Sequence, residues 1–389
     1  MTFLEQAALI APELQALKDD LHRHPEVSFG EHRTTAILRE KLTALGLTLI
    51  DLGMETGVVA VLQGDLPGKT VALRADIDAI FQQEPPKACT SENDGVMHAC
   101  GHDFHTACLF GAARLLTDRK QSLHGSVVFL FQPAEEVTQG AAAMVAHGLW
   151  DKLPTKPQCL FGLHNRPELP VGQVAVLEGP IMAGKTNFEV KLHGVTGHGG
   201  SPHKCVDVIV AGAALVSGIQ TIVSRNADPL ESLVCAVCSI HSGTAENFSP
   251  DLLTLTGSVR AHNPALLDMA LNRIEALSQS TAAGYGCTAE VRLIPQVPVT
   301  YNRPELAALA RLAAERTGLE AVTPRPDLGS EDFSVLGETV PSFFYWLGTG
   351  KAGAQNPCWH SPQFTTDDRA LPMGAALLAE SALAGLADA

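Results

Sequence analysis

The chain has 389 residues, a formal net charge of −15, and 46% hydrophobic against 18% charged residues. This length predicts two domains, and this composition can bury a substantial core, which excludes an intrinsically disordered protein. The surplus of negative charge repels phosphate backbones and anionic lipid, so we expect no nucleic-acid partner and no membrane partner. A small molecule is the better candidate for a partner.

The N-terminal region and the cysteines bear on where the protein works. Residues 1–20 carry Glu5 before a short apolar run and lack a basic start, which predicts an amphipathic helix and not a secretion signal. We find no run of about 18 apolar residues that could cross a bilayer. The nine cysteines lie scattered through apolar segments, which is typical of reduced thiols in a cytosolic protein. We therefore predict a cytoplasmic protein.

Runs rich in Val, Ile and Leu alternate with helical patterns in the first half of the chain. This alternation predicts an α/β domain with a largely parallel sheet. The expected strands are 57–63, 70–78, 125–131, 159–163 and 172–178. The expected helices between them are 31–45, 102–117 and 138–148.

From about residue 183 the pattern changes to strand, long helix, two strands, helix and strand. The expected segments are 187–194, 206–224, 232–243, 252–262, 264–282 and 288–294. This β-α-β-β-α-β order is the split arrangement of a ferredoxin-like fold. After it the α/β pattern resumes with helix 304–318, strand 341–347 and helix 370–386. We expect one domain, 183–294, inserted between the two parts of a larger one, 1–182 and 295–389.

The densest cluster of reactive residue types is HACGHDFH, residues 98–105. It places Cys100, His102 and His105 within six positions at an expected loop-to-helix junction. A helix N-terminus stabilises a thiolate, and thiolate with imidazole suits zinc, cobalt or manganese. The alternative is a buried cysteine beside polar residues that cap the helix.

Two expected strands end in further ligand-type residues. Glu135 and Glu136 follow the apolar run VVFLF, and His164 with Asn165 follows CLFGL. In open α/β sheets, ligands bind just beyond the carboxyl ends of the strands. Adjacent carboxylates can point different ways, so that one binds a metal while the other holds a proton. Each motif alone also fits an ordinary turn, but together they predict one shared site.

Several weaker candidates accompany these motifs. Asp76 and Asp78 end the expected strand TVALRADID and could orient a ligand imidazole or merely satisfy a turn. His360 in NPCWHSPQF, and Glu331 with Asp332 in GSEDF, could join the site or belong to ordinary loops.

A glycine-rich turn, GHGGSPH, lies in the segment expected to be inserted and carries His198 and His203. A flexible polar turn of this kind is typical of a substrate lid. The structural alternative makes the two histidines surface residues.

Taken in chain order, eight motifs resemble one family. They are DLHRHPEVSFGE (20–31), LRADIDA (73–79), GVMHACGHDFHTA (95–107), VVFLFQPAEE (127–136), GLHN (162–165), GHGGSPH (197–203), GSEDF (329–333) and WHSPQF (359–364). The chain resembles the hippurate hydrolase and N-acyl-amino-acid amidohydrolase branch of the aminoacylase/carboxypeptidase metallohydrolases, which also includes plant auxin-conjugate hydrolases. The resemblance covers essentially the whole chain, and CGHD with PAEE is its most specific part.

The resemblance implies a fold, an assembly and a cofactor. The fold is α/β, with a mixed, mostly parallel sheet in a catalytic domain and an inserted ferredoxin-like α+β lid and dimerisation domain. The assembly is a homodimer or a higher homo-oligomer. The cofactor is two divalent metal ions, Mn²⁺, Zn²⁺ or Co²⁺. The implied metal ligands are Cys100, His102, Glu136, His164 and His360.

The resemblance also implies roles in the cleavage of an N-acyl amino acid to a carboxylic acid and a free amino acid. Glu135 is the general base, which takes a proton from the attacking water and hands it to the leaving amine. His198 matches a lid histidine that stabilises the developing oxyanion, often in the partner's site. Asn247 and Arg260 match lid residues that contact the substrate, although an arginine at a strand end can also be only a surface charge.

One departure and two alternatives affect the choice of substrate. Where many relatives read DALP, this chain reads DAIF with Phe81, followed by Gln82 and Gln83, so its preference can differ. A dipeptidase or aminopeptidase would use the same site with a pocket for a free ammonium. A non-catalytic metal-binding protein is disfavoured, because neither a ligand nor the general base is missing. The acyl group, the amino-acid side chain, the metal, and cis or trans action of His198 stay open.

Overall fold

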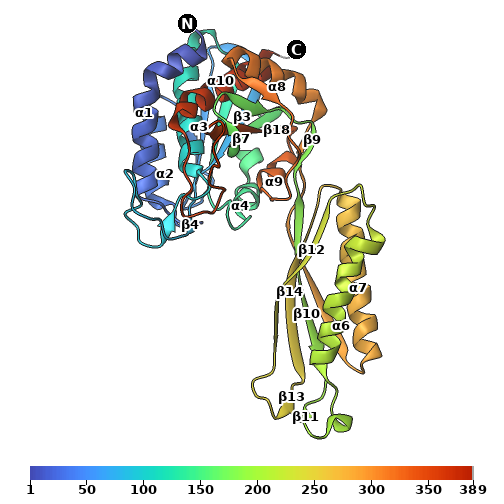
Figure 1. Cartoon of the computed structure of the whole chain (residues 1–389). Coiled ribbons are helices and arrows are strands. Elements are labelled where there is room, and N and C mark those ends of the chain that lie inside the picture. Colours follow the sequence, from blue (N-terminus) through green and yellow to red (C-terminus); the bar gives the residue numbers. More distant parts are fainter. Residues whose placement is uncertain (388–389) are drawn as a thin grey trace. The chain divides into compact units, whose positions relative to one another are not determined.

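The computed structural model describes residues 1–387 and divides into two compact units (Figure 1). Unit 1 contains Met1–Ile181, Tyr301–Arg325 and the chain from Asp332 onwards. Unit 2 contains Met182–Thr300 and Pro326–Glu331. The chain thus passes from unit 1 to unit 2 and back twice, the second time only for Pro326–Glu331.

Unit 1 is built on an eight-stranded mixed sheet. Its strand order is β1 (Thr48–Ile50), β2 (Val58–Gln63), β6 (His124–Gln132), β3 (Leu66–Asp76), β7 (Cys159–Pro170), β18 (Ser342–Gly350), β8 (Gln173–Ala175) and β17 (Glu320–Val322). The central strands β6, β3, β7 and β18 run parallel, whereas β1, β2 and β8 pair antiparallel to neighbours. This confirms the predicted α/β fold with a mixed, mostly parallel sheet. The central strands are apolar runs without alternation, as expected for strands buried on both faces.

Helices pack against this sheet. They are α1 (Phe3–Arg23), α2 (His32–Ala44), α3 (His102–Thr117), α4 (Gly140–Ala146), α5 (Leu149–Lys152), α8 (Pro304–Thr317), α9 (Phe333–Gly337) and α10 (Leu371–Ala387). α3 and α10 lie on β3, and α1 packs against both of these helices. The resulting core includes Phe129, Phe161 and Tyr345, all fully buried.

Local sequence explains where two of these helices begin and end. At α1 the Thr2 side chain accepts from the Glu5 N–H at 3.2 Å, and the Glu5 carboxylate accepts from the Thr2 N–H at 2.8 Å. This reciprocal capping satisfies two backbone donors that the helix cannot use. α8 starts at Pro304 and stops before Gly318, whose φ of 73° ends a helix at little cost in glycine.

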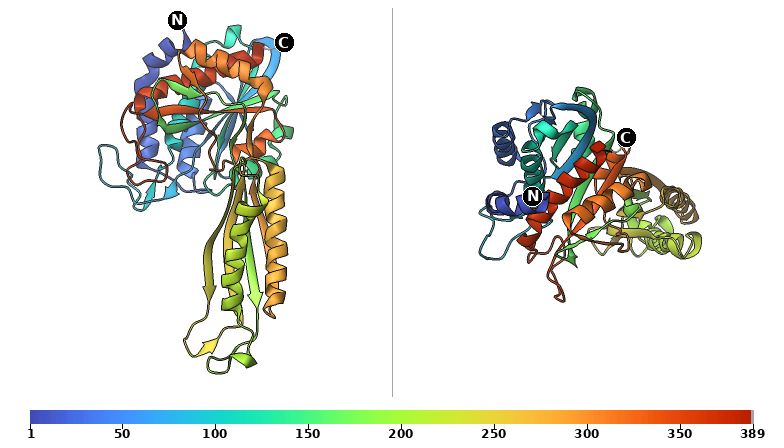
Figure 2. Two further views of the ribbon diagram at one scale, coloured as in Figure 1. Left: turned by 45° about the vertical axis from the view of Figure 1, so that its right-hand side comes forward. Right: turned by 90° about the horizontal axis from the view of Figure 1, so that it is seen from above.

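Unit 2 contains a four-stranded antiparallel sheet with two helices. In chain order its elements are β10 (Gly184–His193), α6 (Val208–Thr221), β12 (Leu233–Ser242), β14 (Leu252–Ala261), α7 (Pro264–Gly284) and β15 (Thr288–Val297). The strand order β12-β14-β10-β15 confirms the predicted ferredoxin-like arrangement. α6 and α7 lie side by side along one face of this sheet (Figure 2). β10 and β14 alternate between buried and half-buried residues, because only one of their faces carries helices.

The structure extends or adds several elements to those predicted. α3 has the predicted bounds 102–117, whereas β7 continues from the predicted end at residue 163 to Pro170. The short strands β1 and β17 and the short helices α5 and α9 had no prediction. Each is only three to five residues long, too short for a hydrophobic period to mark it.

Two described segments reach the length and hydropathy of a membrane span, which corrects the sequence analysis. They are Val208–Asn226 and Asp368–Ala387, with mean hydropathy 1.6 and 1.5. The second is 78% buried and contains α10, so its composition is that of a core helix. The first is 33% buried and packs one side on unit 2.

Candidate metal centre

The carboxyl ends of three parallel strands bring ligand-type side chains to one edge of the large sheet. β3 ends at Asp76, and β6 leads into Glu135 and Glu136. In β7, His164 lies beyond the part of the strand that pairs with β3. Because β3, β6 and β7 run parallel, these residues share one edge, as the strand-end motifs predicted.

The start of α3 supplies two more side chains, on either side of Gly101. Gly101 directly precedes the helix and has a φ of 87°, which glycine adopts without strain. A Cβ atom at this position would come to 2.5 Å from Nδ2 of Asn165. Glycine therefore permits the tight entry into α3 that leaves Sγ of Cys100 at 3.5 Å from Nε2 of His164.

Six side chains form one continuous cluster. The structure contains three overlapping groups whose ligand atoms all lie within 4.8 Å of one another: Cys100–His102–His164, Cys100–Glu136–His360 and His102–Glu135–Glu136. Cys100, His102 and Glu136 each belong to two groups, which joins the three groups together. The structure thus places all six residues that were predicted to bind metal or to act as the general base in one cluster.

His360 reaches the cluster from a loop late in the chain. Its φ of 60° is unusual for a residue other than glycine, and its N–H donates to the Ala99 carbonyl at 2.9 Å. This bond fastens the loop to the segment that carries Cys100. Nε2 of His360 lies 3.3 Å from Oε2 of Glu136, and its side chain is 55% exposed. His360 therefore closes the cluster on its solvent side.

Two buried atoms in the cluster lack a hydrogen-bond partner among the described residues. They are Nε2 of His102 and Oε1 of Glu136, which lie 3.8 Å apart. Buried polar atoms are normally paired, because losing water without a replacement is costly. A divalent cation would accept a lone pair from both atoms. The cluster therefore fits a metal ion, and its mixture of S, N and O ligands suits zinc, cobalt or manganese.

The electrostatics of the cluster also favour a cation. Burial lowers the pKa of His102, but the carboxylates of Asp76, Asp78 and Glu136 outweigh it and raise this pKa to about 10. Surroundings that stabilise a positive charge on this ring stabilise a metal ion in the same place. For His164, burial holds the pKa well below its ordinary value, so its imidazole is neutral and can bind a metal.

Comparison with known proteins assigns the chain to a family. Residues 72–384 match the model of peptidase family M20/M25/M40. The chain belongs to this family. It is 38% identical over 369 residues to N-acetylcysteine deacetylase of Bacillus subtilis (strain 168), covering 94% of this chain and 95% of that protein. It is 36% identical over 370 residues to IAA-amino acid hydrolase ILR1-like 4 of Arabidopsis thaliana, covering 93% and 83%.

A solved structure supports the same assignment. The chain is similar to the crystal structure of the Bacillus subtilis YXEP protein, a dinuclear metal-binding peptidase of the M20 family. The TM-score is 0.87 at 35% identity, covering 98% of this chain and 99% of that one. These findings confirm the resemblance to the aminoacylase and amidohydrolase branch that the motifs predicted.

Asp78 orients two side chains of the cluster in this M20 chain. Its Oδ1 lies 3.1 Å from Nδ1 of His102, which leaves Nε2 of that ring facing the cluster. Its Oδ2 accepts from the Glu136 N–H at 3.0 Å and from the Ser28 hydroxyl at 2.7 Å. Asp78 therefore has the supporting role proposed for it on sequence grounds, and one carboxylate fixes the positions of two candidate ligands.

Asp78→Asn is expected to lower metal affinity by about 10- to 100-fold, the usual cost of removing a carboxylate that orients a ligand. The asparagine side chain keeps one acceptor oxygen, but it places its NH₂ group against a donor, either the His102 ring or the Glu136 N–H. Calorimetric titration with metal measures this change in affinity. Unchanged affinity in Asp78→Asn would contradict the orienting role, and Asp94→Asn is a control at an exposed aspartate that belongs to none of the metal groups.

His105 supports the cluster through hydrogen bonds that use both its ring nitrogens. Nδ1 lies 2.6 Å from Oδ1 of Asp76, and Nε2 accepts from the Asn165 N–H at 2.9 Å. The ligand atoms of Asp76, His102 and His105 also lie within 4.8 Å of one another. The hydrogen bonds of His105 nevertheless occupy its lone pair, which favours a supporting role for this residue over metal binding.

Asn165, Trp359 and Arg166 connect three of the ligand-bearing segments, and sequence reasoning did not identify this role. Asn165 donates from Nδ2 to the Cys100 carbonyl, and its Oδ1 accepts from the Trp359 indole at 3.1 Å. The Trp359 ring lies 4.7 Å from the His164 ring, and the Arg166 guanidinium lies 4.7 Å above Trp359. The motifs GLHN and WHSPQF contain all these residues except Arg166, but nothing in the sequence pairs the two motifs.

Of the GSEDF pair, Asp332 contributes to a fully buried network below the cluster. Arg74 donates to Oδ2 of Asp76 at 2.8 Å and to Oδ1 of Asp332 at 3.1 Å, and all three side chains are fully buried. Asp332 also accepts from the Ala141 N–H at 2.9 Å. The network holds Asp76 in place under His105. Glu331 is buried in unit 2, where its carbonyl lies 3.3 Å from the Thr300 hydroxyl.

The turn that carries Glu135 is held by Glu31. Ala134 has a φ of 55°, and its N–H donates to Oε1 of Glu31 at 2.8 Å. Burial and the nearby Asp78 charge raise the pKa of Glu31 to about 7. Glu135 itself is only 7% exposed, beside His102 and Glu136. A carboxylate in such a position can hold a proton close to a metal site.

The lid candidates His198 and Asn247 lie together at one end of unit 2. His198 belongs to β11 (Gly197–His198), which pairs with β13 (Phe248–Ser249). The Gly199 N–H donates to the Asn247 carbonyl at 3.0 Å. Both side chains are exposed, and so is His203 in the turn Pro202–Lys204.

Arg260 lies at the other end of unit 2. It pairs with Lys185 near the chain's entry into the unit, and its Nη1 donates to the Leu328 carbonyl at 3.0 Å and to Ser330 at 3.2 Å. β13 leads into β14 at Leu252, and the eight residues from there to Arg260 span roughly 26 Å of strand. Within one chain, unit 2 therefore does not bring Arg260 to His198 and Asn247.

Proposed function

We propose that this M20 chain is a metal-dependent amidohydrolase that cleaves the amide bond of N-acyl amino acids. The observation that carries the proposal is the single cluster of Cys100, His102, Glu136, His164 and His360 beside Glu135. The named substrates of the two relatives, N-acetylcysteine and IAA-amino acids, are amides between a carboxylic acid and the amino group of an amino acid. The products here would be a carboxylic acid and a free amino acid.

The five ligands would hold two divalent ions, as the description of the YXEP protein indicates for that relative. We propose Mn²⁺, Zn²⁺ or Co²⁺ from the mixed donor set. When bound, these ions act as Lewis acids that activate water and polarise the amide carbonyl. Cys100, His102 and Glu136 each belong to two groups of the cluster and are placed to contribute to both positions.

Glu135 would move the proton that the reaction needs. Its carboxylate takes the proton from the attacking water and passes it to the nitrogen of the leaving amine. Glu136, the next residue, would bind metal instead, because its Oε1 has no hydrogen-bond partner within residues 1–387 and its Oε2 faces His360. Two neighbouring carboxylates thus take different roles.

A substrate panel tests this function on the metal-reconstituted protein. We expect acetyl-, benzoyl- and indoleacetyl-amino acids to be hydrolysed at higher kcat/KM than dipeptides with a free amino group. The reverse order would favour the alternative dipeptidase or aminopeptidase. Phe81 is 80% exposed in β4 (Ile80–Phe81), so Phe81→Ala is a first variant for mapping acyl-group preference.

We propose that His198 and Asn247 serve the site of a partner subunit. They lie about one strand length from Arg260 within unit 2, so the lid of one chain cannot place all three side chains on one substrate. In a homodimer His198 would stabilise the oxyanion in the partner's site. This explains why the lid residues lie at opposite ends of unit 2.

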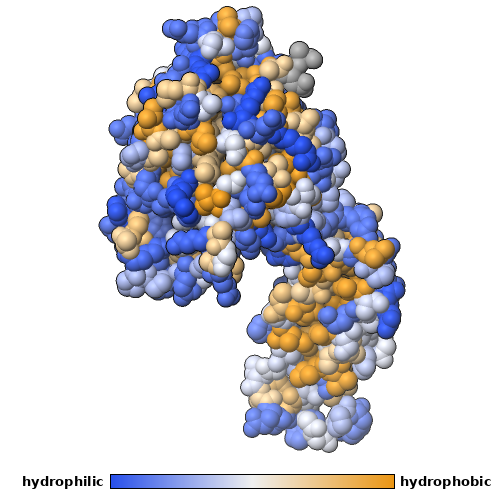
Figure 3. All heavy atoms as spheres, turned by 45° about the horizontal axis from the view of Figure 1, so that its top comes forward, coloured by the Kyte–Doolittle hydropathy of each residue, from blue (hydrophilic) through white to orange (hydrophobic). Residues whose placement is uncertain are grey.

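Unit 2 has a surface suited to a second copy of the chain. β12 is an edge strand with unpaired backbone groups, and apolar side chains gather on the visible face of unit 2 (Figure 3). The exposed ones on α6 and β12 include Ile209, Val210 and Ile240, each between 47% and 51% exposed. Edge pairing would continue the sheet across a two-fold axis and cover these side chains.

Mixing two inactive variants tests the trans arrangement. Glu135→Gln and His198→Ala homodimers should each be nearly inactive. After subunit exchange, some hybrid dimers hold one intact composite site, so activity should return toward about a quarter of wild type, as random pairing gives half hybrids with one site each. Exchange is verified with differently tagged subunits. No recovery after verified exchange would mean that His198 acts in cis or not at all.

Arg260 is proposed to bind the substrate's α-carboxylate, because a protein of charge −15 must place a fixed cation to attract it. Arg260→Ala should lower kcat/KM by about 30-fold or more, since losing a desolvated ion pair costs roughly 2–5 kcal/mol. Arg260→Lys should rescue only in part, because lysine lacks the planar fork.

The control for Arg260 is a substrate whose carboxylate is amidated. It should be poor for the wild type and little further affected by the mutation. Equal losses on acid and amide would make Arg260 structural, through its bonds to Leu328 and Ser330.

The proposed location is the cytoplasm. None of the nine cysteines forms a disulfide within residues 1–387, and several are buried in the cores of the two units. Reduced thiols of this kind persist in a reducing compartment.

A further inference from the structure

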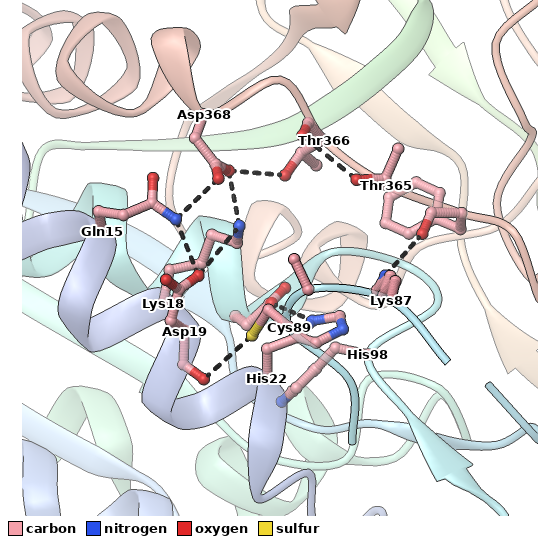
Figure 4. Close-up of a pocket in the computed structure, with 13 residues that line it drawn as sticks. Gln15, Lys18, Asp19, His22, Lys87, Cys89, His98, Thr365, Thr366 and Asp368 are labelled. Carbon is pink, nitrogen blue, oxygen red and sulfur yellow. Dashed lines mark hydrogen bonds and ion pairs between the residues drawn. The ribbon is translucent and has the colours of Figure 1, made fainter. Parts of the chain in front are cut away.

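Unit 1 contains a cavity that is separate from the metal cluster, since none of the six cluster residues lines it. It lies between α1, the segment 87–89 and the segment 364–368, and its volume is about 330 Å³ (Figure 4). It is near the lower limit of pockets that hold drug-sized ligands, so a small molecule fits best.

His98 lines this cavity and is the observation that points to a ligand. It is 2% exposed, and neither ring nitrogen has a hydrogen-bond partner among the described residues. A neutral imidazole offers one N–H donor and one acceptor, and burial without partners is costly for both. The neighbouring His22 and Asp103 do not hydrogen-bond His98, because they lie 2.7 Å apart and hydrogen-bond to each other.

One side of the cavity is rich in acceptors. Gln15 donates from Nε2 to Asp19 at 2.8 Å and to Asp368 at 2.7 Å, which holds the two carboxylates beside the cavity. Lys18 lies 2.6 Å from Asp368 and 3.6 Å from Asp19, so it neutralises only part of this charge. A ligand ammonium would find two carboxylates here.

A cation stands apart from this acidic side. Figure 4 shows Lys87 away from Gln15, Asp19 and Asp368, and its Nζ lies 3.3 Å from the Phe364 carbonyl. Lys87 also pairs with Glu84 at 2.5 Å, and its side chain is 31% exposed. A ligand carboxylate would find Lys87 and the N–H of His98.

The balance of charges selects the kind of ligand. Two ammonium groups, Lys18 and Lys87, and three carboxylates, Asp19, Asp103 and Asp368, line the cavity. Asp103 is paired with His22 at 2.7 Å, so Asp19 and Asp368 are the carboxylates left to face a ligand. A simple anion would lie beside the carboxylates, and a simple cation beside the ammonium groups. A small molecule that carries both charges satisfies both sides.

We propose that this cavity is a binding site for a free α-amino acid. The ammonium lies toward Asp19 and Asp368, the carboxylate toward Lys87, and His98 hydrogen-bonds the carboxylate. A free amino acid is also the product class of the proposed reaction. Binding in this cavity needs no turnover, however, so the site stands or fails separately from the proposed function.

Calorimetric titration of the metal-loaded protein tests the site. The probes are glycine, L-alanine, L-leucine and L-glutamine, each added alone. We expect at least one to bind saturably with a Kd in the millimolar range or below. Its amide, which lacks the carboxylate, and its α-hydroxy acid, which lacks the ammonium, should each bind at least tenfold more weakly. No saturable binding, or equal binding of the amino acid, its amide and its α-hydroxy acid, would overturn the proposal.

Variants locate the binding. Lys87→Met and Asp19→Asn should each weaken amino-acid binding at least tenfold, whereas Lys120→Met, an exposed lysine outside the cavity, should not. His98→Phe keeps a ring without nitrogen atoms and should also weaken binding. Because His98 is close to Cys100, its metal content is measured as well, and if metal falls the other two variants decide. Wild-type affinity in Lys87→Met and Asp19→Asn would place the amino acid elsewhere, for example as product at the metal cluster, and would overturn the proposal.

Discussion

Removal of metal with a chelator is expected to abolish amide hydrolysis, and Mn²⁺, Co²⁺ or Zn²⁺ is expected to restore it. The reason is the state of the cluster without a cation. Nε2 of His102 and Oε1 of Glu136 are buried without a hydrogen-bond partner in the described part of the chain, and three carboxylates surround His102. A bound cation would give both atoms a partner and would balance the negative charge of the carboxylates. A metal that binds only the folded state, present at 100 times its Kd, raises the free energy of unfolding by about 2.7 kcal/mol. Chelation removes this stabilisation, so Tm should also fall.

Cys100→Ala gives the same test at one ligand. Cys100 belongs to two groups of the cluster, so its loss should lower the metal content found by elemental analysis and with it the activity. Cys358→Ala is the matched control, because Cys358 is exposed and lies only two residues from His360. Full metal occupancy and activity in Cys100→Ala would contradict the assignment of this thiol.

Much of the fold could be predicted because burial leaves a direct pattern in the chain. The run VVFLF is continuous and not alternating, since β6 is covered on both faces, and it predicts a central strand. In unit 2 the strands alternate, because only one face carries α6 and α7. The helix at 102–117 could be placed to the residue, because Gly101 ends the preceding loop and the largely apolar run ACLFGAARLL (107–116) predicts a buried helix.

The candidate ligands could be predicted for a related reason, since parallel strands end at one edge and their end residues must meet. The supporting residues could not. The bond from Trp359 to Asn165 joins positions 194 residues apart, and no local period or turn signal predicts such a pair. The separation of Arg260 from His198 and Asn247 likewise depends on the register of β14, which becomes known only when the strands are paired.

Glu135→Gln and Glu136→Gln are expected to fail in different ways, although the two residues are adjacent and the two changes identical. Glu135→Gln should keep its metal and fold while its rate falls by about 10²–10⁴, the usual contribution of a positioned general base. The amide cannot accept the proton of the attacking water. Glu136→Gln should instead lose metal, because Glu136 offers one oxygen toward His102 and the other toward His360.

Three measurements on each variant separate the two roles: metal content by elemental analysis, Tm, and kcat at saturating metal. Glu338→Gln, an exposed glutamate of unit 1, is the control for the substitution itself. If excess metal restores activity to Glu136→Gln but not to Glu135→Gln, binding and proton transfer are divided as proposed. If both variants lose metal, Glu135 is a ligand too. If neither does, Glu136 is not one, and the buried Oε1 beside His102 must find its partner in another way.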